Sequence, residues 1–232
     1  MEADSGLSEK ADKENFIVVY PNGTGNQGSW NAGSCCEGNA SDDVAFVKLL
    51  VNQLHGKFLI DEDRIFAVGM SNGAMLANRL ACELPEIIAA IGTVAGVRVV
   101  DPCTPSRPVA ILHIHGDIDR VVPYDGKDGV LTGLSVQQHI DFWVKCNRST
   151  ANSLELSNDT RVSTQTLYAA SPVQPSADVM LITIKGGGHL WPGQPFPSRI
   201  TDPVRKKLLG TTTQKLSAND EIWKFFVNHP KR

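Results

Sequence analysis

The sequence lacks the features of a membrane-spanning or nucleic-acid-binding protein. No apolar run approaches the roughly 20 residues that a membrane span requires, and no basic block or basic–aromatic run indicates a nucleic-acid surface. The net charge of the 232-residue chain is only −3, and charged residues make up 20% of it. The first residues, MEADSGLSEKADKEN, are acidic and indicate helix rather than a signal peptide. Membranes and nucleic acids are therefore not expected as partners.

Cysteine is scarce, and its spacing does not match a zinc site. The five cysteines form no pair of C-x-x-C units, so we expect no metal. Because five is odd, at least one thiol is free or bonds another chain. Neighbouring cysteines rarely bond each other, although Cys35 and Cys36 could each reach a distant partner. Four N-x-S/T sequons also occur, at Asn22, Asn39, Asn147 and Asn158. Together, these features favour an oxidising compartment.

Short apolar runs alternate with longer amphipathic segments, which is typical of parallel strands joined by crossover helices. Strands are expected in FIVVYP from Phe16, RIFAVG from Arg64, IIAAIGTVAGV from Ile87, PVAILHIHG from Pro108 and DVMLITIKGGG from Asp178, with an exposed antiparallel strand in TRVSTQTLYAA from Thr160. Helices are expected over residues 42–58, 72–84, about 135–145 and 217–229. No repeat or low-complexity linker interrupts the chain, so we expect residues 1–232 to form one α/β domain.

The segment Gly69-Met70-Ser71-Asn72-Gly73 fits the G-x-S-x-G elbow of serine hydrolases, in which a strand turns sharply into a helix. In this turn the residues two before and two after the serine must be small, so that strand and helix can approach. The backbone N–H of Asn72 would then face an oxyanion beside Ser71. The alternative is an ordinary turn serine, because so short a motif also arises by chance.

A carboxylate and an imidazole follow two later strands. Asp119 comes after PVAILHI and His189 after DVMLITI, and ligands bind at this carboxyl edge of an open α/β sheet. The order Ser, Asp, His is the one that α/β hydrolases use. A serine hydroxyl needs a base to accept its proton, and a carboxylate orients that base. The three residues therefore predict a catalytic triad of Ser71, Asp119 and His189.

Other residues compete for two of these roles. Asp117 and Asp125 are neighbouring acids, but we prefer Asp119 because it is the third residue after His115-Gly116 and precedes the Val-Val-Pro run. His189 lies between three glycines and a Trp-Pro-Gly sequence, which predicts a rigid loop that presents the imidazole. His115, on a predicted strand, is interpreted as structural.

The sequence resembles the polyhydroxybutyrate depolymerase and feruloyl esterase family of α/β hydrolases, together with the related acetyl xylan esterases. The resemblance covers most of the chain, in FIVVYPNG, GSWN with the following CC, DDVAFVKLLV, RIFAVGMSNGAMLANRLACELP, HGDIDRVVPYDG and GGGHLWPG. It implies an α/β-hydrolase fold, Ser71 as nucleophile, Asp119 as acid, His189 as base, no cofactor, and export with disulfides. Trp30 and Trp191 are candidate walls of an acyl or aromatic pocket, or pack beneath a long loop.

The chain departs from this family at its N-terminal end, where the first strands are lacking. The second oxyanion donor normally comes from a loop in that missing part, and losing one donor costs about 3 kcal/mol of transition-state stabilisation. The missing strand would lie between FIVVYP and RIFAVG. These two strands must therefore pair directly with each other, or leave backbone hydrogen-bonding groups unpaired on both sides of a gap. Either Met1 is not the natural start, or the variant is short and impaired. A replacement donor could come from the loop 22–41 or from another protomer.

The expected function is a serine carboxylic-ester hydrolase that acts through an acyl-enzyme. Its substrates are expected to be feruloyl or other hydroxycinnamoyl esters, or other short-chain or polymeric esters such as polyhydroxyalkanoates and acetylated xylan. Two alternatives stay open. One is a serine peptidase, because HGDIDRVVP also resembles the acid loop of prolyl-oligopeptidase relatives. The other is a binding or scaffold protein with impaired catalysis.

Overall fold

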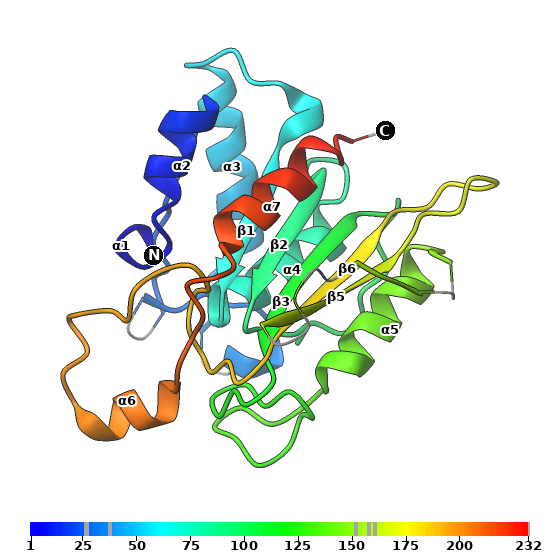
Figure 1. The fold of residues 1–232 in the computed structure, drawn as a ribbon. Helices are drawn as coiled ribbons and strands as arrows, with labels where there is room; N and C mark the ends of the chain where they lie inside the picture. The colour runs from blue at the N-terminus through cyan, green and yellow to red at the C-terminus, as the bar shows by residue number, and fades with distance from the viewer. Residues whose placement is uncertain (26–27, 37–38, 151–152, 157–158, 160–161, 232) are drawn as a thin grey trace.

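A six-stranded sheet forms the centre of the molecule in the computed structural model, which describes residues 1–231 except 26–27, 37–38, 151–152, 157–158 and 160–161 (Figure 1). The strand order is β1-β2-β3-β6-β5-β4. The strands are β1 (Phe66–Met70), β2 (Ala90–Val94), β3 (Ala110–Gly116), β4 (Ser153–Glu155), β5 (Ser163–Tyr168) and β6 (Val179–Ile184). The first four strands of this order are parallel, and β5 and β4 add antiparallel pairs. The expected α/β class with a mostly parallel sheet is confirmed.

Helices cover both faces of this sheet. They are α1 (Glu2–Ser5), α2 (Leu7–Glu14), α3 (Asp43–His55), α4 (Asn72–Glu83), α5 (Val136–Cys146), α6 (Pro203–Leu209) and α7 (Ala218–Val227), with short 3-10 turns η2 (Ser34–Cys36) and η3 (Glu62–Arg64). Ile91 and Ile111 point into one core with α4 and α5. Their neighbours Ala90 and Leu112 point into a second core with α7. Successive strand residues thus face opposite layers, as the period of two requires.

Side-chain caps explain where three of the predicted helices begin. The side chain of Asp42 accepts a hydrogen bond from the Ala45 N–H at the start of α3. Ser135 begins α5 with a capping box that uses Gln138. Ser217, one of two caps considered from the sequence, accepts from the Asp220 N–H at the start of α7.

The segment FIVVYP is not a strand, and the expectation of a buried strand from Phe16 is wrong. Val18 and Tyr20 pack against the core beside β1, but Ile17 and Val19 are 53% and 41% exposed. Among the described residues, β1 has a hydrogen-bonded neighbour only in β2, so it forms one edge of the sheet. Apolar, β-branched sequence is not enough to make a strand, because a strand also needs a partner that satisfies its backbone groups.

The disulfides also differ from expectation. Cys35 and Cys36, which lie together in η2, are bonded to each other rather than to distant partners. Cys82 of α4 bonds Cys103 in the loop after β2, where the two Cα atoms are 5.1 Å apart. Cys146, the remaining cysteine, is free and half-buried. The tight turn at η2 brings adjacent thiols together, and cysteine spacing does not reveal such a turn.

One sequon is inaccessible in the folded chain. The Asn147 side chain is fully buried, donates to the Val109 carbonyl over 2.6 Å and accepts from the Val109 N–H over 3.2 Å. Asn147 therefore holds α5 against β3 rather than carrying a glycan. Asn158, another sequon position, lies outside the described residues.

The described ranges show neither a membrane-spanning helix nor a metal site. No described helix is both long and apolar enough to cross a membrane. Within the same ranges, no cluster of three or more His, Cys, Asp or Glu side chains is arranged to hold a metal ion.

Candidate active site

Ser71 occupies the sharp turn between β1 and α4. Its backbone has φ 54° and ψ −122°, a left-handed value that side chains rarely adopt. Two hydrogen bonds hold this strained residue: its N–H donates to the Val94 carbonyl over 2.9 Å, and its carbonyl accepts from the Met75 N–H over 3.0 Å. Strain of this kind persists only where surrounding structure enforces it, and it concentrates at functional sites.

The glycines around Ser71 have different roles. A Cβ on Gly69 would lie 2.3 Å from the backbone of Gly73, so this glycine lets strand and helix approach. A Cβ on Gly73 would meet nothing within 4 Å, and the expectation that this position must be small is wrong. Gly96, which the sequence analysis missed, lies against the turn, because its Cβ would be 2.4 Å from the Ser71 carbonyl oxygen.

Asp119 and His189 form a buried hydrogen-bonded pair. His189 Nδ1 lies 2.7 Å from Asp119 Oδ2, and both residues are 5% exposed. The other carboxylate oxygen, Oδ1, accepts from the N–H groups of Val121 and Val122 over 2.8 and 3.0 Å. The backbone N–H of His189 donates to the Leu209 carbonyl over 2.7 Å. The Asp119 carboxylate is therefore held by the backbone of its own loop, and the backbone of His189 is held by the end of α6.

The competing acids serve other loops. Asp117 accepts from the Gly186 N–H over 2.7 Å and ties the β3 loop to the β6 loop. Asp125 accepts from the Lys127 N–H over 2.9 Å within its own turn. Among the described residues, neither is hydrogen-bonded to His189, whereas Asp119 is.

All three predicted triad residues follow the carboxyl ends of parallel strands: Ser71 follows β1, Asp119 follows β3, and His189 follows β6 (Figure 1). A neutral His189 that donates its Nδ1–H to the carboxylate has its lone pair on Nε2, the atom that a general base needs. In the described part of the chain, no hydrogen bond joins Ser71 Oγ to His189. Such contacts are often long before substrate binds and tighten in the Michaelis complex.

The side chain of Asn72 has a role that the sequence analysis did not predict. Its Oδ1 accepts from the Trp30 N–H over 2.7 Å, and its Nδ2 donates to the Trp30 carbonyl over 3.1 Å. Nδ2 also lies 3.1 Å from Cys36 Sγ. The Trp30 ring stacks on Phe46 of α3, with centroids 6.3 Å apart. Asn72 therefore joins the first turn of α4 to the loop that carries Trp30 and the adjacent disulfide.

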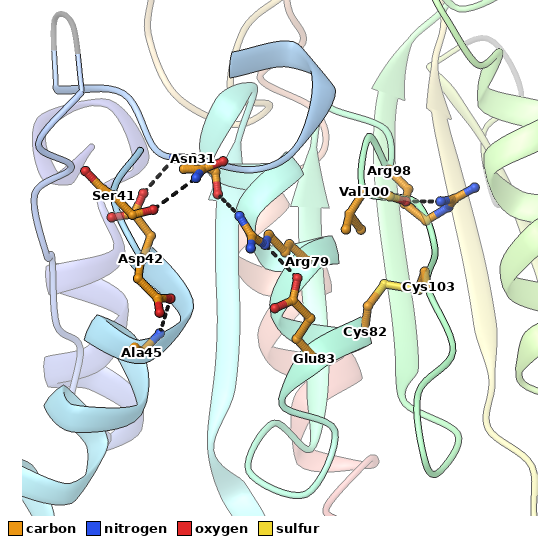
Figure 2. A network of polar contacts seen from close by, with 11 residues as sticks. Asn31, Ser41, Asp42, Ala45, Arg79, Cys82, Glu83, Arg98, Val100 and Cys103 are labelled. Carbon is orange, nitrogen blue, oxygen red and sulfur yellow. Dashed lines mark hydrogen bonds and ion pairs between the residues drawn. A yellow bond between two sulfur atoms is a disulfide. The ribbon is translucent and has the colours of Figure 1, made fainter. Parts of the chain in front are cut away.

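A second set of contacts holds this loop to α3 and α4 (Figure 2). Arg79 of α4 donates through Nη1 to the Asn31 carbonyl over 2.7 Å and through Nε to Glu83 over 2.7 Å. The Asn31 N–H donates to Asp43 Oδ2 over 2.6 Å. Because the N–H groups of Trp30 and Asn31 are both used, neither is free to act as the second oxyanion donor.

An open cleft of about 450 Å³ lies beside this loop. It is lined mainly by polar residues, which include Asn31, Ser34, Asn39, Arg79 and Asp101. Cys36, the disulfide partner that contacts Asn72, also lines it. Ser71, Asp119 and His189 are not among the residues that line this cleft.

Trp191 does not line an open pocket. It is 3% exposed and lies in the core with Leu216 and Phe225, and its indole N–H donates to Asn219 of α7 over 2.9 Å. Of the two tryptophans considered from the sequence, only Trp30 is partly exposed near the nucleophile turn.

The chain was compared with known proteins. The model of the family described as esterase PHB depolymerase matches residues 5–121. The chain belongs to this family. Its members are carboxylic ester hydrolases, and the matched residues include the turn at Ser71 and the loop at Asp119.

Relatives and solved structures agree with this assignment. The putative esterase NocK of Nocardia uniformis subsp. tsuyamanensis is 29% identical over 98% of this chain and 70% of its own length. Feruloyl esterase B of Piromyces equi is 31% identical over 81% of this chain, but over only 36% of its own length. An acetyl xylan esterase from Aspergillus awamori has a similar fold, with a TM-score of 0.58 and 18% identity over 89% of this chain and 81% of that one.

Proposed function

We propose that this chain hydrolyses carboxylic esters through an acyl-enzyme on Ser71, with His189 as the base and Asp119 as the carboxylate that orients it. The observation that carries the proposal is the buried 2.7 Å hydrogen bond between Asp119 and His189, at the same sheet edge as the strained Ser71. Family membership supports ester chemistry independently of this geometry.

The proposed reaction has two halves. Ser71 Oγ attacks the ester carbonyl as His189 Nε2 accepts its proton, and the alcohol leaves after it takes that proton from the imidazolium. Water then attacks the acyl-enzyme, with the same imidazole accepting a proton from water and returning it to Ser71. Asp119 stabilises the imidazolium in both halves, and the Asn72 N–H, in the unsatisfied first turn of α4, donates to the oxyanion.

An impaired binding or scaffold protein is a second candidate. The N–H groups of Trp30 and Asn31 are both occupied, so neither supplies a second oxyanion donor. Loss of one donor lowers turnover about 10²- to 10³-fold, so a site that relied on Asn72 alone would be a weak esterase. Low turnover with intact Ser71 chemistry supports the esterase proposal, and no Ser71 chemistry supports the scaffold.

For the substrate, we propose a feruloyl or other short-chain ester, by likeness to the feruloyl esterase of Piromyces equi. Trp30 is the proposed wall for an aromatic acyl group, because it is half-buried and its backbone is hydrogen-bonded to Asn72, the residue after Ser71. A polyhydroxyalkanoate or acetylated xylan is the alternative substrate. The two disulfides support a location outside the cell.

A panel of esters tests the proposal. Hydrolysis of methyl ferulate, p-nitrophenyl acetate, acetylated xylan and polyhydroxybutyrate is measured for the wild type, Ser71→Ala, His189→Ala and Asp119→Asn, with a peptide substrate included. We expect the wild type to cleave at least one ester. Each of the three variants should cleave that ester much more slowly. Equal cleavage by Ser71→Ala would contradict the proposal, and cleavage of the peptide alone would favour a peptidase.

A further inference from the structure

Three buried histidines lie behind the Asp119 loop and take no part in the proposed proton transfer. His113 and His115 belong to β3, and His139 belongs to α5. They are 0%, 1% and 0% exposed, in that order. Buried polar groups need hydrogen-bond partners, so the partners of each ring indicate what the ring holds in place.

One continuous set of hydrogen bonds runs from β2 to the Asp119 loop. Thr93 Oγ1 lies 2.8 Å from His113 Nδ1, and His113 Nε2 lies 3.0 Å from His115 Nδ1. His115 Nε2 then lies 2.8 Å from the carbonyl oxygen of Val122. His139 is outside this set, because its Nδ1 accepts from the Arg98 N–H over 3.1 Å.

The donor and the acceptor of each hydrogen bond in this set follow from the last acceptor, the Val122 carbonyl. Burial lowers the pKa of both His113 and His115, so each ring is neutral and carries one N–H. The Val122 carbonyl can only accept, so the proton of His115 is on Nε2. His113 then donates from Nε2 to His115 Nδ1. The Thr93 hydroxyl, which also lies 3.2 Å from the Leu112 carbonyl oxygen, donates its one proton to the nearer His113 Nδ1. The opposite arrangement would leave a nitrogen lone pair of His115 facing a carbonyl oxygen.

Val122 connects this set to the proposed catalytic acid. Its carbonyl accepts from His115, while its N–H donates to Asp119 Oδ1 over 3.0 Å. The His115 N–H also lies beside the carboxylate itself, with 3.6 Å between Nε2 and Asp119 Oδ2. Oδ2 is the same oxygen that binds His189.

The remaining polar and charged groups near these rings lie on other sides. The ring of His139 is 4.6 Å from that of His113, and Arg98 lies over the ring of Phe142 on α5. Tyr124 meets the edge of the His115 ring, with centroids 5.9 Å apart. Of the three buried histidines on β3 and α5, His115 is thus the one that contacts both Val122 and the Asp119 carboxylate.

We propose that His115 is a positioning residue for the reaction. Its Nε2–H holds the Val122 carbonyl, the Val122 N–H holds Asp119 Oδ1, and the carboxylate fixed in this way aims the imidazole of His189. The proposal rests on the proposed function, because it assigns a support to the proposed acid. A catalytic carboxylate with two free rotations would present Oδ2 to His189 only part of the time, and outer hydrogen bonds remove that freedom.

The experiment compares four variants in the full chain. His115→Phe keeps a ring of similar volume and removes both hydrogen bonds. His115→Gln places an amide N–H where Nε2 was. Thr93→Val removes only the hydroxyl at the start of the set. His139→Asn is the matched control, because it changes an equally buried histidine and keeps an acceptor for Arg98.

Two readouts separate positioning from general destabilisation. The first is kcat against KM for the best ester substrate. The second is the far-downfield proton NMR resonance of the hydrogen bond between His189 and Asp119, which is observed without turnover. Because it does not depend on turnover, the resonance still tests the role of His115 if the wild type cleaves none of the esters. Loss of cleavage in Ser71→Ala separately tests the proposed function.

We expect His115→Phe to lower kcat about fivefold to tenfold with KM unchanged, and to broaden or shift the resonance. Of the two hydrogen bonds that it removes, the one to Val122 acts on the carboxylate, and the net contribution of one hydrogen bond corresponds to a rate change of about this size. His115→Gln should restore most of both, Thr93→Val should act in the same direction more weakly, and His139→Asn should match the wild type. A normal resonance in His115→Phe, the same change in His139→Asn, or no recovery in His115→Gln would overturn the proposal. If His115→Phe does not fold, Thr93→Val and His115→Gln decide it by the same readouts.

Discussion

The two glycines of the serine turn provide a sharp test, because the structure gives them opposite roles. In Gly69→Ala the new Cβ would lie 2.3 Å from the carbonyl carbon and oxygen of Gly73, where ordinary contact begins at 3.4 Å. The first turn of α4 must therefore move by about 1 Å. A shift of that size costs about 1–3 kcal/mol of stability when a packed site is overfilled. A displacement of about 1 Å at reacting groups costs about 10²-fold in rate.

The control for this prediction is Gly73→Ala. Its Cβ meets nothing within 4 Å, and alanine is preferred to glycine inside a helix by about 1 kcal/mol. Thermal unfolding should therefore lower the melting temperature of Gly69→Ala by about 2–12 °C and leave that of Gly73→Ala equal or higher. Ester hydrolysis should fall only in Gly69→Ala. A fully active and stable Gly69→Ala, or equal damage in both variants, would refute this account of the turn.

Two further predictions concern the buried histidines and Asn72. Burial lowers the pKa of His139 to about 3 from 6.5, so only the unfolded chain gains this proton as pH falls below 6.5. The free energy of unfolding should therefore drop by about 2 kcal/mol between pH 7 and 5 through this group alone. The drop should be smaller in His139→Asn. A free energy of unfolding in urea that does not change with pH would contradict this prediction. Asn72→Ala should lower the free energy of unfolding in urea by about 1–3 kcal/mol and change the fluorescence of Trp30, and Asn72→Asp should have an intermediate effect. If Asn72→Ala keeps the stability and fluorescence of the wild type, Asn72 does not anchor the loop.

Much of the parallel sheet could be predicted because each parallel strand is an apolar run closed by turn residues. Ala90–Val94, Ala110–Gly116 and Val179–Ile184 fall inside runs identified from the sequence, and Phe66–Met70 extends one residue beyond the predicted run RIFAVG. The segment from Phe16 has the same composition but is not paired with a strand in the described part of the chain. Strand formation there depends on a distant partner, which local composition does not encode.

The candidate site could be predicted only where chemistry and chain order define it. Ser71, Asp119 and His189 follow three strand ends, and the structure brings Asp119 to His189. The contact of Gly96 with the Ser71 carbonyl could not be seen, because it joins two loops across the sheet. The burial of Trp191 beneath α7 was equally hidden, since a tryptophan after a catalytic-type histidine suits either a pocket or a core.

The reactivity of Ser71 tests the central claim most directly. The folded protein is incubated with a fluorophosphonate, and the adduct is located by intact-mass and peptide mass spectrometry. The account predicts one adduct per chain, on Ser71, which is absent from Ser71→Ala and strongly reduced in His189→Ala. A well-folded sample that stays unlabelled, or that is labelled at another residue, would contradict it.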